Sequence, residues 1–121
     1  MGFKERYERT LADLAASCRD AGRDPREVRL VAVSKTVGVA EVAAALKAGA
    51  CDFGENRPDM LMEKAEAFPN ATWHFIGNIQ SRRIGDIVAH ASLVPSLHPE
   101  RHLAKFDAAA AAAGTVDEVL L

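Results

Sequence analysis

The sequence has 121 residues, of which 49% are hydrophobic and 26% charged, a size and balance typical of one globular domain. Fifteen Lys and Arg against 17 Asp and Glu give a formal net charge of −2, which argues against a nucleic-acid-binding surface. No apolar run reaches the roughly 18 residues of a membrane span, and the charged first segment does not resemble a secretory signal. Two cysteines, far apart, suggest neither a disulfide scaffold nor a zinc site. We therefore expect a cytoplasmic protein that binds no nucleic acid, metal or membrane.

The chain opens with an amphipathic helical pattern. Apolar residues recur at steps of three or four from Phe3 to Cys18, and Gly22 is suited to end the helix. Cys18 lies on the apolar stripe, so we expect it to be a small buried residue.

Short apolar runs then alternate with further helical patterns. The expected strands are 28–33, 51–54, 73–77, 92–94 and 119–121. The expected helices are 39–47, 58–68, 81–88 and 102–113. The run from Leu30 to Val33 shows no alternation of apolar and polar residues, which favours a strand buried on both faces. Pro58 suits a first helical position, and Ser81 suits a helix cap.

Repeated strand–helix units with short links favour an α/β fold with a parallel sheet. Four units and the start of a fifth make about half of a (β/α)₈ barrel, which typically takes about 250 residues. We therefore predict the amino-terminal half of a TIM-like barrel with an extra amino-terminal helix, as one partial domain over residues 1–121. A small open α/β sheet fits the periodicity equally well. For a half-barrel, we expect a monomer or weak self-association through the open edges.

Lys35 is the most informative polar residue, because functional groups in parallel α/β folds gather at the carboxyl ends of strands. It follows the first expected strand, with only Ser34 between them. Partial desolvation there would disfavour the ammonium form, and a neutral amine can attack a carbonyl to form a Schiff base. The alternative is a lysine whose ammonium group reaches solvent.

Other polar residues at strand ends allow two interpretations each. His74, on the third expected strand, is either a hydrogen-bonded core histidine or a catalytic base. Asn56, which follows Glu55, either caps the next helix or contacts a ligand. Arg82 and Arg83 are either solvated or contact an anion. The sequence contains no Gly-rich phosphate loop, no H-E-x-x-H motif and no Gly-x-Ser-x-Gly elbow.

Three strings at these strand ends resemble a known family. They are LVAVSKT at 30–36, DFGEN at 52–56 and WHFIGNIQSRR at 73–83. In this order and spacing they resemble the pyridoxal phosphate homeostasis proteins, which share the barrel domain found at the amino end of alanine racemases. The resemblance extends from about the first helix to Leu121.

The resemblance implies a cofactor site. Lys35 would carry pyridoxal 5′-phosphate (PLP) as an internal aldimine, Val33 and Asn56 would lie beside the cofactor, and His74 and Gly77 would line the same mouth. It further implies a protein that holds PLP for cofactor homeostasis without established turnover, with PLP-dependent apo-enzymes as partners.

The sequence also departs from the family. Arg57-Pro58-Asp59-Met60 replaces a stretch with Tyr and Gln, and the family's phosphate-binding loops come from a second half that this sequence lacks. One alternative is therefore a truncated half-barrel that binds PLP weakly or not at all. Another is a PLP-dependent amino-acid racemase. A racemase needs a second acid/base group, and the single tyrosine, Tyr7, falls on the core stripe of the first helix.

Overall fold

The computed structural model describes residues 2–97, 99–114 and 118–119. The strands are β1 (Ala32–Val33), β2 (Asp52–Glu55), β3 (Thr72–Phe75), β4 (Leu93–Val94) and β5 (Glu118–Val119). The helices are α1 (Phe3–Asp20), α2 (Val39–Lys47), α3 (Pro58–Ala67), α4 (Ile84–His90) and α5 (Pro99–Ala113), with 3₁₀ turns η1 (Pro25–Glu27) and η2 (Ser81–Arg83). None of the helices in the described part of the chain has the length and apolarity needed to cross a membrane.

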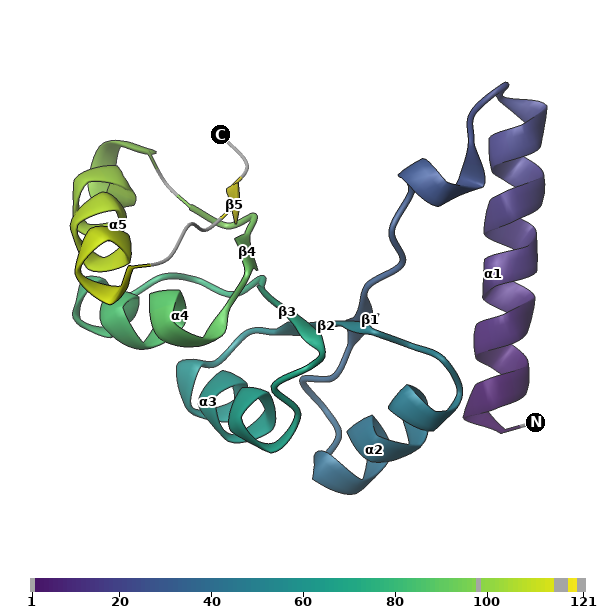
Figure 1. Cartoon of the computed structure of the whole chain (residues 1–121), viewed down its shortest axis with the longest axis horizontal. Helices are drawn as coiled ribbons and strands as arrows, with labels where there is room; N and C mark the ends of the chain where they lie inside the picture. Colours follow the sequence, from purple (N-terminus) through teal and green to yellow (C-terminus); the bar gives the residue numbers. More distant parts are fainter. Residues whose placement is uncertain (1, 98, 115–117, 120–121) are drawn as a thin grey trace.

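The strands form one five-stranded sheet in the order β1-β2-β3-β4-β5, and every pair is parallel. The sheet is curved, with α2 to α5 along its outer, convex side and α1 beside its β1 edge (Figure 1). Each crossover returns the chain to the same end of the sheet, so the carboxyl ends of neighbouring strands lie together. The predicted α/β fold with a parallel sheet is confirmed.

The hydrophobic core lies between the sheet and its covering helices. Phe53 of β2 is opposite Trp73 of β3, and their rings stack with centroids 5.2 Å apart. Phe75 and Leu61 are completely buried in the same cluster. Complete burial of side chains of this size contributes about 1.5–3 kcal/mol each. This core fixes the strand ends that carry the polar residues.

The concave side of the sheet is different. Val33 is 52% exposed and Ile76 is 37% exposed, although both are apolar. The expectation that the first strand is buried on both faces is therefore wrong, and its regular part is only two residues long. The reason is that, within the described residues, no helix packs on the concave side of the sheet (Figure 1).

The first helix agrees with its prediction in extent but less in burial. α1 is followed by Gly22, whose φ of +72° favours glycine, and Cys18 is buried as expected. Phe3 and Leu11, on the same stripe, are exposed.

Two helix starts differ from the prediction. Ser81 does not cap a helix but lies in η2, and α4 begins after Arg83 without a side-chain cap. The last helix begins three residues earlier than predicted, at Pro99, because proline suits the first helical turn. The predicted final strand is present at Glu118–Val119, and its remaining residues lie outside the described ones.

Candidate functional site

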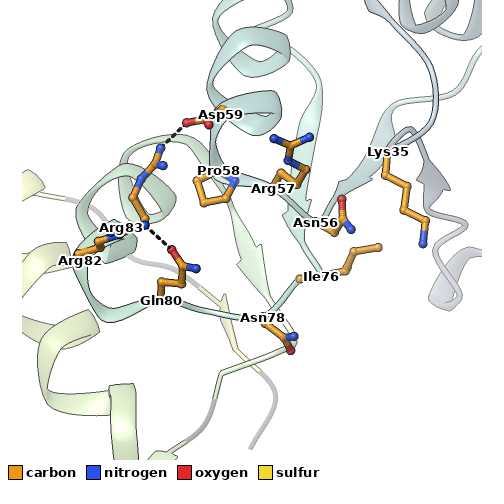
Figure 2. A pocket seen from close by; sticks show the side chains of 11 residues that line it. Lys35, Asn56, Arg57, Pro58, Asp59, Ile76, Asn78, Gln80, Arg82 and Arg83 are labelled. Atoms are coloured by element: carbon orange, nitrogen blue, oxygen red, sulfur yellow. Dashed lines mark hydrogen bonds and ion pairs between the residues drawn. The ribbon is translucent and has the colours of Figure 1, made fainter.

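A hollow of about 590 Å³ lies at the carboxyl ends of β1, β2 and β3 (Figure 2). Each of the three strands contributes residues that follow its carboxyl end within a few positions. The lining residues are Lys35, Asn56, Arg57, Pro58, Asp59, Ile76, Gly77, Asn78, Gln80, Arg82 and Arg83.

Three of the five predicted site residues, Lys35, Asn56 and Gly77, line this hollow. Lys35, Asn56 and Ile76 lie at one end, and Arg82 and Arg83 at the other (Figure 2). Asn56 is exposed and does not cap α3, whose N-cap position is held by Arg57 without a side-chain cap bond. The structure therefore contradicts the cap interpretation of Asn56.

Val33 and His74 lie elsewhere. They line a second hollow, of about 510 Å³, on the concave face of the sheet. Ile76 lines both hollows, so the two adjoin at the end of β3. His74 is buried and its Nε2 lies 3.0 Å from Oδ1 of Asp52, so it is the hydrogen-bonded histidine of the first interpretation. Asp52 also pairs with Arg29, at 3.4 Å.

Lys35 is exposed, which contradicts the expectation that its amine is desolvated. Among the residues that the structure describes, none forms a layer on the concave side that would exclude water from Lys35. Its position comes from a tight turn, because the Val37 amide donates to the Ser34 carbonyl at 3.2 Å across it. The turn thus places Lys35 at the hollow, where its exposed side chain is accessible to a ligand.

Cations dominate the lining of the hollow. The lining contains one carboxylate, that of Asp59, and four cationic side chains: Lys35, Arg57, Arg82 and Arg83. The guanidinium group of Arg83 is already neutralised by ion pairs with Asp59, at 2.6 Å, and Asp86, at 2.9 Å. Lys35, Arg57 and Arg82 are exposed. The hollow therefore favours an anionic ligand.

The pair between Arg83 and Asp59 holds one wall of the hollow. The guanidinium hydrogen bond and charge of Arg83 lower the pKa of the Asp59 carboxyl below its usual value. At neutral pH the carboxylate is charged, so it keeps Arg83 directed toward α3 (Figure 2). Arg82, on the same turn, donates to the side-chain oxygen of Gln80 at 3.3 Å.

Gly77 lies where the chain leaving β3 meets the chain leaving β2. A Cβ atom at Gly77 would come within 2.1 Å of the Asn56 carbonyl oxygen. The preceding amide, that of Ile76, donates to the Glu55 carbonyl at 2.9 Å. Only glycine fits this approach, so the two walls of the hollow are locked together here.

A buried polar cluster lies behind the turn that carries Lys35. Lys64 of α3 and Glu55 of β2 are both completely buried, and Lys64 Nζ lies 2.6 Å from Glu55 Oε2. Sequence reasoning missed this cluster. The available signal was the position of Lys64 between Leu61 and Ala65 on the buried stripe of α3.

Metal binding has no support in the described part of the chain. Residues 2–97, 99–114 and 118–119 contain no group of three or more His, Cys, Asp or Glu that could hold a metal ion.

A known protein domain and curated relatives are both similar to this chain. The alanine racemase N-terminal domain matches residues 10–121. A pyridoxal phosphate homeostasis protein of Pseudomonas aeruginosa is 42% identical over 95 residues, which cover 77% of this chain and 41% of that protein. One from Synechocystis is 41% identical over 76 residues, covering 60% of this chain and 35% of that protein.

Solved structures agree. A protein of unknown function from Bifidobacterium adolescentis superposes with a TM-score of 0.87 at 30% identity, covering 98% of this chain and 53% of that one. PipY of Synechococcus elongatus, solved with PLP bound, superposes with a TM-score of 0.75 at 31% identity, covering 92% of this chain and 53% of PipY. This chain therefore spans about half the length of these structures. The predicted fold, the amino-terminal half of a barrel, is confirmed, and the chain belongs to the family of the alanine racemase N-terminal domain.

Proposed function

We propose that this chain binds pyridoxal 5′-phosphate through a Schiff base to Lys35 and holds it for cofactor homeostasis. The observation that carries the proposal is that Lys35, Asn56 and Gly77 meet at one cationic hollow. The relatives add support, because the curated ones are named pyridoxal phosphate homeostasis proteins and PipY has been solved with PLP bound.

The residues of the hollow fit this ligand. PLP is an aldehyde that carries a phosphate, so it needs an amine and cationic or N–H donors. Lys35 offers the amine, and the exposed guanidinium groups of Arg57 and Arg82 suit a phosphate. The volume of about 590 Å³ is within the usual range for small-molecule sites, about 300–1,000 Å³.

The covalent step follows from the chemistry of an amine. After the Lys35 ammonium group gives one proton to water, its Nζ would attack the aldehyde carbon, a C=N bond would replace the C=O bond, and the oxygen would leave as water with the two remaining amine hydrogens. When bound, PLP supplies this aldehyde and an electron-accepting ring. Because Lys35 is exposed, water can also reverse the step. Reversible attachment suits a protein that holds PLP and passes it to PLP-dependent apo-enzymes.

Retention without turnover is part of the proposal. A two-base racemase needs an acid/base group opposite the lysine. Tyr7 is the single tyrosine, and its hydroxyl donates to the Gly49 carbonyl at 3.4 Å, on the segment that leads into β2. Lys35 lies at the other end of the sheet, after β1. This placement supports binding rather than racemisation.

Absorbance titration tests the function. The purified chain is titrated with PLP, and the visible absorbance of the Schiff base is followed for the wild type and for Lys35→Met. Lys105→Met, which removes an exposed lysine of α5, serves as the matched control. We expect saturable absorbance in the wild type and control, and its loss in Lys35→Met. Equal, non-saturable absorbance in all three would overturn the proposal and favour a half-barrel that does not bind PLP specifically. If the wild type with bound PLP racemises alanine, the proposal that it holds PLP without catalysing a reaction is overturned.

A further inference from the structure

A buried ion pair lies on the helix-covered side of the sheet, opposite the face that is open to solvent. Lys64 and Glu55 are both 0% exposed, and the distance from Nζ to Oε2 is 2.6 Å. The second oxygen of the carboxylate, Glu55 Oε1, is buried and has no hydrogen-bond partner among the residues that the structure describes. Removing two charges from water costs several kcal/mol per ion before their attraction repays it. Well-packed apolar residues would stabilise the fold equally well, so stability alone does not explain this pair.

The pair is connected directly to the turn that carries Lys35. Lys64 Nζ donates to the main-chain carbonyl of Ser34 at 2.6 Å. The Ser34 hydroxyl donates to Glu55 Oε2 at 2.5 Å, so the side chain and the carbonyl of Ser34 are both held. The same carbonyl accepts the Val37 amide at 3.2 Å and closes the turn.

The pair also reaches the second wall of the hollow. Glu55 is the last residue of β2, and Asn56 follows it directly. The main-chain carbonyl of Glu55 accepts the Ile76 amide at 2.9 Å, and this bond holds the end of β3. One buried pair therefore connects the strand ends that carry Lys35, Asn56 and Gly77.

We propose that Lys64 is a positioning residue for Lys35. Its ammonium group, held by Glu55, fixes the Ser34 carbonyl and thereby the turn 34–37 that presents the Lys35 amine to the hollow. This inference rests on the proposed function of Lys35, but the fixed turn is a property of the chain that is measurable without PLP. Lys64 does not react with PLP, because it is completely buried.

The test uses two variants with different electrostatic consequences. Lys64→Met removes the ammonium group and leaves the Glu55 carboxylate buried and unpaired. The double variant Glu55→Gln/Lys64→Met removes both charges, so it avoids the unpaired charge and recovers thermal stability. The Ser34 carbonyl lacks its lysine donor in both. Lys105→Met serves as the control for loss of a lysine.

Two readouts separate positioning from stability. The first is hydrogen exchange of the Val37 amide without PLP, which reports opening of the turn. The second is the ratio of PLP labelling at Lys35 to labelling at the exposed Lys47, after borohydride reduction. In both variants we expect Val37 exchange to rise about tenfold and the ratio to fall about tenfold, the effect of one charge-assisted hydrogen bond.

Each outcome decides the proposal. A double variant that is as stable as the wild type but keeps fast Val37 exchange and a low ratio supports it. The proposal is overturned if the double variant recovers wild-type Val37 exchange and wild-type Lys35/Lys47 labelling together with its stability. It is also overturned if Lys64→Met folds and shows the same exchange and labelling ratio as the wild type. If Lys64→Met does not fold, the double variant alone decides. If the wild type is not labelled at Lys35 while Val37 exchange still rises in the variants, the proposed function fails and the fixed turn stands.

Discussion

Gly77 provides the sharpest structural prediction, because it lies where two walls of the hollow touch. In Gly77→Ala the new methyl carbon would lie 2.1 Å from the Asn56 carbonyl oxygen and 2.7 Å from its carbonyl carbon and Cα. These are backbone atoms, which cannot rotate away. The chain after β2 or the chain after β3 must therefore move by about 1 Å to reach an ordinary contact distance.

The magnitude follows from two contributions. Forcing one extra carbon into a well-packed position costs about 1–3 kcal/mol. The shift also strains the bond from the Ile76 amide to the Glu55 carbonyl, 2.9 Å long, and loss of such a bond costs about 1 kcal/mol. We expect Gly77→Ala to lower the free energy of unfolding by about 2–4 kcal/mol.

Urea denaturation followed by circular dichroism measures this change, and Gly85→Ala is the matched control. Gly85 lies within α4, and a Cβ atom there meets nothing within 4 Å. Alanine is favoured over glycine inside a helix, so Gly85→Ala should stabilise the chain by about 0.5–1 kcal/mol. If Gly77→Ala were as stable as the wild type, the close contact between the strand ends would be wrong.

Three further predictions concern residues around the core and the hollow. The Cys51 thiol is exposed, but its hydrogen bond to Asp52, 3.3 Å long, raises the pKa of the thiol. Its reaction with a disulfide reagent at pH 8 should therefore be slow, and it should become several-fold faster in Asp52→Asn. Equal reaction rates in the two proteins would contradict this prediction. Arg83 lowers the pKa of Asp59, so the pair's contribution to stability is present above about pH 4 and is lost as the pH falls through the lowered pKa. Thermal melts of Asp59→Asn and the wild type should therefore converge at low pH, and a constant difference would refute the pair's role. Phe75→Ala removes a completely buried ring and should cost about 3–5 kcal/mol in urea denaturation; a loss below about 1 kcal/mol would contradict its place in the core.

The fold was predictable because its signals are local. Short apolar runs between helical patterns indicated the approximate position of each α-helix and β-strand in the described residues, and Pro58 marked the first turn of α3 correctly. Burial was less predictable. The apolar run that ends at Val33 predicts a strand buried on both faces of the sheet, but in the described residues the concave face is open to solvent. Sequence periodicity does not show whether a layer of structure covers a given face.

The site was predictable in part, for a similar reason. The rule that parallel strand ends share one edge placed Lys35 and Asn56 together, and the family resemblance added Gly77. All three line the same hollow. Val33, the last residue of β1, and His74, within β3, line the adjoining hollow on the concave face instead. The distinction depends on side-chain direction, which alternates along a strand and requires the register to be known.

The pairing and the solvent exposure of the charged side chains were the least predictable features. A lysine among apolar helix residues indicates burial, but its partner, Glu55, is nine residues away and comes close only through the packing of α3 on β2. The exposure of Lys35 depends in the same way on tertiary structure, since it is set by what covers the concave side. Local sequence therefore locates these groups but does not determine their solvation.

The most direct test of the proposed function is the location of the covalent link. The chain is incubated with PLP, reduced with borohydride and digested, and the modified lysines are identified by mass spectrometry. We predict that the label is concentrated on Lys35 and far weaker on the exposed Lys4, Lys47 and Lys105. A label spread evenly over these four lysines, or no label, would contradict the assignment of Lys35 as the residue that holds the cofactor.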